Sequence, residues 1–154
     1  AAVRAAGDEE AVRERLRRLV WSMNHESGNV IWMAPDAAGE ILSAVPSLSG
    51  EFSHIVASFI NLEPFVEGVH RAVSRIAGAA PDPVAYLAPY LEFAVSRPEA
   101  SIRAHSALAL GSIDPTRIPS LRTMLAGDDA LLELYDRSTG LIVETTVERL
   151  VLAD

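Results

Sequence analysis

The segment from Asn24 to Met33 gathers residue types that could form a binding site. It reads NHESGNVIWM, so an amide, an imidazole and a carboxylate precede Trp32, an aromatic side chain of the kind that anchors interfaces. A link of about ten residues is long for packed helices, and long ordered links are often functional. We therefore expect Asn24, Glu26 and Trp32 to form a partner or ligand surface. The alternative is structural: Asn24 and Ser27 cap helix ends, Glu26 pairs locally, and Trp32 closes the exposed end of the core.

The histidines are the next candidates, because imidazole is a common metal ligand and proton carrier. They are His25, His54, His70 and His105, and no two of them show the H-x-x-x-H spacing that places two ligands on one helix face. His54 and His70 fall among polar residues of their predicted helices, which indicates solvated faces. His54 remains a candidate contact for a ligand, and we expect no metal and no cofactor.

A groove for an anion or an acidic peptide could form around Arg71, Arg75 and Arg103. Each falls on the second helix of a predicted helix pair, and in a solenoid the second helices line the concave side. The alternative is simple ion pairing with Glu40, Glu67 or Glu99. The sequence shows no catalytic motif: cysteine is absent, no G-x-S-x-G turn occurs, and the acidic residues are scattered along the chain. The sequence thus favours a non-enzyme without deciding the question.

Composition narrows the classes of partner. The chain has 154 residues, one domain over 1–154, with 13 basic residues, 21 acidic residues and a net charge of -8. An acidic domain is a poor match for nucleic acid, since its basic residues must neutralise phosphates against its own field. No stretch approaches about 18 uncharged apolar residues, so we expect no membrane association and a cytoplasmic location.

Hydrophobic periodicity predicts an all-α domain, in which proline and acidic residues mark the helix starts. A first helix follows Asp8, with Val12, Leu16 and Met23 on its buried stripe. The other expected helices cover residues 35–45, 49–60, 64–77, 82–96 with a bend at Pro89, 98–113 opening on Pro98, and 114–127. This makes three helix pairs plus a seventh helix.

The last thirty residues or so change character, since LLELYD and LIVETT are rich in β-branched and aromatic residues around turn residues 137–140. We expect a C-terminal β-hairpin and then a short closing helix, opened by a capping box of Thr145 and Glu148. A continuous helix over 129–152 is the alternative, weakened by Gly140 and the β-branched residues that follow it.

The second helices of the three pairs share a short pattern. A small residue stands at Gly39, Ser74 and Gly111, and an isoleucine follows two positions later, at spacings of 35 and 37 residues. Such a period is typical of a two-helix solenoid, where the small residue allows close helix approach and the isoleucine fills the shared core.

The region from Pro89 to Ile113, with the IPSLRTML that follows, resembles the HEAT-like repeats of bilin lyase subunits and many bacterial proteins. The shared residues are Pro89, Leu91, Arg103, Ala104, Ala107, Leu108 and Gly111. The usual turn acid before the proline is replaced by Arg97, so the usual Asp to Arg turn lock is not assumed for Arg103.

The N-terminal run resembles the opening of a small single-domain bacterial HEAT-like family that includes proteins of sulfate reducers. The shared pattern comprises Trp21, Asn24, Glu26, Ser27, Gly28, Trp32, Pro35, Ala37, Gly39, Glu40 and Ile41. Together the two resemblances imply a HEAT-like α-solenoid and a non-catalytic scaffold that binds another protein. The bilin lyase similarity suggests the alternative, binding of a tetrapyrrole or bilin-like molecule, or a lyase-type activity on it.

Overall fold

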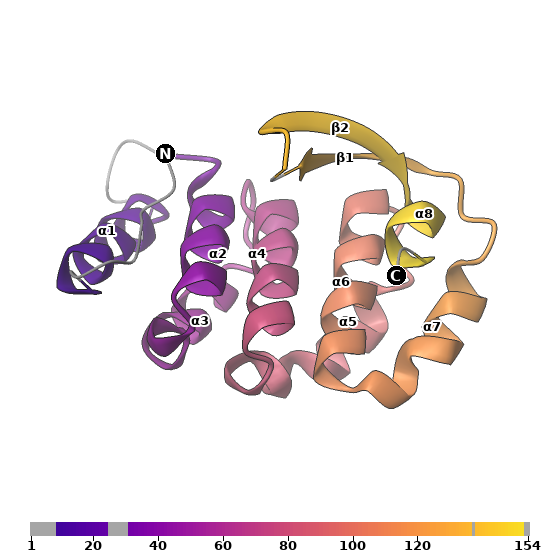
Figure 1. The fold of residues 1–154 in the computed structure, drawn as a ribbon, viewed down its shortest axis with the longest axis horizontal. Coiled ribbons are helices and arrows are strands. Elements are labelled where there is room, and N and C mark those ends of the chain that lie inside the picture. The colour runs from indigo at the N-terminus through magenta and orange to yellow at the C-terminus, as the bar shows by residue number, and fades with distance from the viewer. Residues whose placement is uncertain (1–8, 25–30, 137, 153–154) are drawn as a thin grey trace.

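The computed structural model in Figure 1 describes residues 9–24, 31–136 and 138–152, and over these ranges the chain is mainly helical. The α-helices are α1 (Glu9–Ser22), α2 (Ala34–Ala44), α3 (Ser49–Ala57), α4 (Val66–Ala79), α5 (Ala88–Ala94), α6 (Ala100–Ile113), α7 (Ile118–Leu125) and α8 (Val147–Leu152). A two-stranded antiparallel sheet, β1 (Leu131–Asp136) and β2 (Leu141–Thr146), comes before α8. The expected cap of α1, Asp8, lies outside the described residues.

The helices form two layers. α2, α4 and α6 lie side by side in the front layer of Figure 1, with contacts between α2 and α4 and between α4 and α6. α3 and α5 lie behind them and pack on α4 and α6 respectively. Apolar side chains from both layers fill the space between them; the largest fully buried ones include Leu16, Met23, Leu42, Phe65, Ile76, Leu91, Ile102 and Leu110.

Several helices begin later than their prolines predict. Residues 82–87 form a 3-10 helix, and α5 starts at Ala88, so Pro89 lies in the first turn of a new helix and does not bend a longer one. Proline lacks the N–H that an α-helix interior requires, which explains the break. Pro98 lies before the N-cap Glu99 of α6 and is not its first residue, and Pro115 opens a 3-10 turn ahead of α7.

The small residues and isoleucines that recur in the second helices of the predicted pairs have different environments in the structure. A Cβ on Gly39 would lie 2.5 Å from the Cα of Ala72, so this glycine does allow α2 and α4 to approach closely. A Cβ on Gly111 would meet only the side chain of Ile118, at 3.2 Å. Ile76 is fully buried, whereas its counterparts Ile41 and Ile113 are half-buried and lie at the edge of the core.

Beyond α7 the chain forms the predicted hairpin and not the continuous helix. Leu131 pairs with Thr146 and Asp136 with Leu141, and Gly140 adopts a φ of +73°, which L side chains rarely adopt. The closing helix follows, but its cap is one residue later than expected: the Thr146 hydroxyl accepts from the Arg149 N–H at 3.2 Å. Thr145 is a strand residue, and Glu148 instead accepts from the Gly127 N–H at 2.9 Å.

The hairpin lies across the helix array. In Figure 1 it starts beside α6 and α8 and runs back toward α4 and α2. α8 packs on α6 and α7 and buries Val147 and Val151, which fixes the base of the hairpin. No described helix combines the length and apolar composition needed to cross a bilayer.

Candidate functional site

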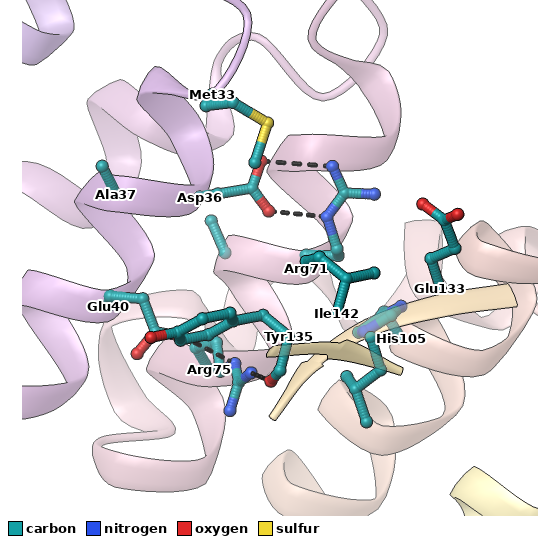
Figure 2. Close-up of a pocket in the computed structure, with 12 residues that line it drawn as sticks. Met33, Asp36, Ala37, Glu40, Arg71, Arg75, His105, Glu133, Tyr135 and Ile142 are labelled. Carbon is teal, nitrogen blue, oxygen red and sulfur yellow. Dashed lines mark hydrogen bonds and ion pairs between the residues drawn. The ribbon is translucent and has the colours of Figure 1, made fainter. Parts of the chain in front are cut away.

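The hairpin and the front helices enclose two neighbouring clefts. The first, the α2–α4 cleft, has a volume of about 350 Å³ and lies between α2, α4 and one face of the hairpin (Figure 2). Its lining includes Met33, Asp36, Ala37, Glu40, Arg71, Arg75, His105, Glu133, Leu134, Tyr135 and Ile142. The second, the α6 cleft, has a volume of about 440 Å³ and is lined by Ser74, Arg75, His105, Leu108, Leu134, Tyr135, Asp136, Val143 and Leu150. Arg75, His105, Leu134 and Tyr135 line both clefts.

Arg71, one of the predicted site residues, points from α4 toward α2. Its Nε donates to one oxygen of Asp36 at 2.6 Å and its Nη2 to the other at 3.1 Å (Figure 2). Its Nη1 also donates to Glu67 at 3.4 Å and to the hydroxyl of Ser101 at 3.4 Å. Burial acts to lower the pKa of Arg71, but the hydrogen bonds and negative charges of Asp36 and Glu67 together outweigh burial, and the pKa is raised. The guanidinium is therefore held in place by acids of this chain.

Arg75 is held in the same way one turn further along α4. It forms an ion pair with Glu40 of α2 at 3.0 Å, and its Nη2 donates to the backbone carbonyl of Tyr135 at 3.2 Å. The second bond ties the hairpin to α4. Because Arg71 and Arg75 both face acids, the structure favours the ion-pairing alternative over an anion groove in this cleft.

Arg103, the third arginine, is not part of the described lining of either cleft. It donates to Asp128 through two nitrogens, at 2.9 and 3.0 Å, and to the backbone carbonyls of Arg97 and Pro98 at 2.9 and 2.6 Å. Arg103 thus holds the turn before α6 through its bonds to these two backbone carbonyls, although Arg97 stands in place of the usual acidic residue. Glu99, expected as an arginine partner, pairs with Arg97 at 3.1 Å.

His105 is the residue that sequence reasoning did not connect with the cleft. Only 3% of it is exposed, and it lines both clefts between α4, α6 and the hairpin. Its Nδ1 lies 2.8 Å from the carbonyl of Ser101. Burial is the main reason why its pKa is lowered to about 4, and the nearby Arg71 and Arg75 add to this effect. His105 is therefore neutral at physiological pH.

His70 repeats this geometry one helix earlier, with its Nδ1 2.7 Å from the carbonyl of Val66. The two histidines are 35 positions apart, and this regular spacing is a signal that could have linked them from sequence. The prediction that His70 lies on a solvated face is wrong: it is 1% exposed, and its ring lies 5.8 Å from that of Tyr90. Burial lowers its pKa. A row of polar residues on one face of a helix can thus be buried, because a neighbouring helix covers that face.

His54 behaves as its polar surroundings predict, being exposed on α3 in the back layer, and it lines neither cleft. Asn24 is also exposed, just after the end of α1, and is not part of the described lining of either cleft. Glu26 lies outside the described residues, as do His25 and Ser27. The structure therefore brings only Arg71 and Arg75 of the predicted set into the α2–α4 cleft.

Trp32 lies beside that cleft and is 70% exposed. It lines a third hollow of about 260 Å³, which also includes Met33, Glu67, Arg71 and Ile102. Met33 belongs to both this hollow and the α2–α4 cleft, so the two are neighbours. The alternative in which Trp32 closes the end of the core is wrong, because a core residue would be buried.

Within residues 9–24, 31–136 and 138–152, no three His, Asp or Glu side chains form a group that could hold a metal ion. Comparison of the chain with protein-family models, with curated proteins and with solved structures finds no match.

Proposed function

We propose that this chain is a HEAT-like α-solenoid that acts as a non-catalytic scaffold and binds another protein. We further propose that the partner contacts the Trp32 surface, which we define as Ile31, Trp32 and Met33 together with Tyr135 and Ile142 across the α2–α4 cleft. The proposal has two parts, the architecture and the surface.

The regular register between front helices supports a solenoid. The pairs Asp36–Arg71 and Glu40–Arg75 each join residues 35 positions apart on α2 and α4. His70 and His105 give the same interval between α4 and α6, with matching bonds to backbone carbonyls. Equivalent residues of successive helix pairs then lie side by side, as stacked repeats require. This interval also matches the two-helix repeats to which the sequence is similar.

The exposure of the Trp32 surface carries the binding proposal. Trp32 is 70% exposed, Met33 59% and Ile31 46%, and these three residues are consecutive. Across the cleft, Ile142 is 59% exposed and Tyr135 46%. A cluster of large apolar side chains around a cleft is costly to leave in water, and such clusters mark protein interaction sites.

The charges around this surface indicate the chemistry of the partner. Arg71 and Arg75 are paired with acids of α2, and Glu67 and Glu133 add further negative charge at the same place. Because the arginines of the described cleft lining are already paired with acids, an acidic partner would meet repulsion there. We therefore expect the partner to present an apolar patch with a neutral or basic rim.

The test uses one substitution and a matched control. Trp32→Ala should abolish capture of a stoichiometric partner from an extract of the native cell and leave the melting temperature almost unchanged, since exposed substitutions usually alter stability by no more than about 0.5 kcal/mol. Phe93→Ala is the control, because Phe93 is 67% exposed on α5 in the back layer, and it should retain the partner. Equal loss in both variants, or retention in both, would contradict the proposal.

The α2–α4 cleft is also the place to test the alternative, the small-molecule role suggested by the similarity to bilin lyases, although its excess of carboxylates opposes the propionates of such a molecule. A tetrapyrrole or bilin-like molecule would enter the α2–α4 cleft from its open side. Its binding would change the absorption spectrum of added bilin or haem, and Ala37→Leu, which narrows the cleft, would reduce the change. A spectrum that the protein does not alter would leave the scaffold as the function to pursue.

A further inference from the structure

A buried, polar side chain lies where the α2–α4 cleft meets the α6 cleft. His105 is only 3% exposed, yet it lines both hollows, so part of its side chain borders open space. His70 offers a contrast: its Nε2 is sealed within the protein and has no partner among the described residues. The two histidines thus have the same bond at Nδ1, but the ring of His70 is sealed inside the protein whereas His105 borders the clefts.

The hydrogen bond at Nδ1 decides which chemistry His105 offers to the cleft. The Ser101 carbonyl can only accept, so the Nδ1 of the neutral ring carries the hydrogen and donates it. Nε2 then has a lone pair and no hydrogen. Within the described part of the chain, no donor reaches this atom, so a ligand with an N–H or O–H group would satisfy it.

The rest of the lining restricts the ligand further. Met33, Ala37, Leu134 and Ile142 supply apolar walls, and a methionine sulfur packs well against aromatic rings. The carboxylates of Asp36, Glu40 and Glu133 outnumber the guanidiniums of Arg71 and Arg75, both of which are already paired with acids. An anionic ligand is therefore disfavoured, whereas a flat, uncharged ring with a donor suits both the walls and the histidine.

We propose that the α2–α4 cleft binds a phenol or an indole, with its ring between Met33, Ala37 and Ile142 and its O–H or N–H donating to Nε2 of His105. The volume of about 350 Å³ falls within the range of small-molecule sites. This chemistry has two sources, a free small molecule or a tyrosine or tryptophan side chain of a partner, and the inference stands whichever source applies.

The binding test uses 4-methylphenol and indole as probes and 4-fluorotoluene as a control that has nearly the shape of 4-methylphenol but lacks the donor. We expect both probes to bind, and the control to bind about tenfold more weakly for loss of a hydrogen bond to a buried acceptor. Nitrogen-15 NMR of the histidine side chains should show the Nε2 resonance of His105 shift on adding a probe, with His70 and His54 unaffected. Failure of both probes to bind at millimolar concentration, or equal binding of the control without an Nε2 shift, would overturn the proposal.

Two variants separate binding from folding. His105→Phe keeps a buried ring and removes the acceptor, so it should reduce probe binding about tenfold. Ala37→Leu fills the cleft from the half-buried face of α2 and should block the probes even if His105→Phe does not fold. His54→Phe, in the back layer, is the matched control and should bind as the parent does. Unchanged binding in Ala37→Leu would place the probes elsewhere and refute the site.

A last comparison distinguishes the two sources of the ring. Gly-Trp-Gly and Gly-Tyr-Gly amides present the same groups with peptide attached. Tighter binding of these amides than of indole and 4-methylphenol supports insertion of a partner's side chain, and weaker binding supports a free small molecule. If neither the amides nor the free probes shift Nε2, the inference fails, whereas the partner test with Trp32→Ala is unaffected.

Discussion

The close approach of α2 and α4 at Gly39 gives a sharp test of the fold. An ideal Cβ added to Gly39 would lie 2.5 Å from the Cα and 2.8 Å from the Cβ of Ala72, where ordinary contacts begin at 3.4 Å. The obstacle includes backbone, which no rotamer change can move. Gly39→Ala should therefore force α2 and α4 apart and disturb the pairs Asp36–Arg71 and Glu40–Arg75 that join them.

Two effects of opposite sign set the magnitude. Overpacking a well-packed contact costs about 1–3 kcal/mol, while replacing glycine by alanine inside a helix gains roughly 0.5–1 kcal/mol. A clash with backbone belongs at the upper end of the first range, so we expect the free energy of unfolding to fall by about 2 kcal/mol. For a chain of this length that lowers the melting temperature by roughly 4–8 °C.

Gly78→Ala is the matched control. Gly78 is exposed in α4, and a Cβ there would have nothing within 4 Å, so only the propensity gain applies. Circular dichroism at 222 nm during heating or urea unfolding should show Gly78→Ala melting slightly above the parent and Gly39→Ala well below it. If Gly39→Ala is as stable as Gly78→Ala, the close approach of α2 and α4 is not real and our reading of their register is wrong.

Three further predictions follow from the structure. His105 should titrate near pH 4 by NMR. Because its pKa is about 4 in the folded chain and 6.5 in the unfolded one, its contribution to stability is complete above pH 6.5 and is lost as the pH falls through 4. The parent should thus lose about 3 kcal/mol more than His105→Phe between pH 7 and pH 4, and equal losses would show that His105 is not buried in its neutral form. Arg103→Lys should cost about 1–3 kcal/mol by urea unfolding, because lysine cannot bond Asp128 and two carbonyls together, whereas the exposed Arg18→Lys should change little. A chain ending at Gly127 should bind the dye ANS or aggregate, since it lacks the buried Leu132, Val147 and Val151; a soluble chain with a cooperative transition like the parent's would make the C-terminal segment an appendage.

The sequence predicted the helices well where apolar periodicity was strong and less well where proline was the main signal. Val12, Leu16 and Met23 mark a stripe that is buried in the structure, because a period of 3.6 residues leaves one face for the core. Proline indicates that a regular helix is interrupted but not which residue begins the next one. Pro89 and Pro98 were therefore assigned to the wrong helix positions.

The candidate site likewise divides into features that the sequence predicted and features that only the structure reveals. Sequence alone placed Arg71 and Arg75 on the second helix of a predicted pair and Trp32 in a link between helices. Whether the arginines are free or paired, and whether Trp32 is buried or 70% exposed, depended on what the neighbouring helix and the hairpin place beside them. His105 became a site residue only because a hairpin some thirty positions later folds back beside it. Periodicity is a local property of the chain and fixes which face of a helix turns inward, whereas burial, ion pairing and cleft lining are set by segments far away in sequence, and these only the tertiary structure brings together.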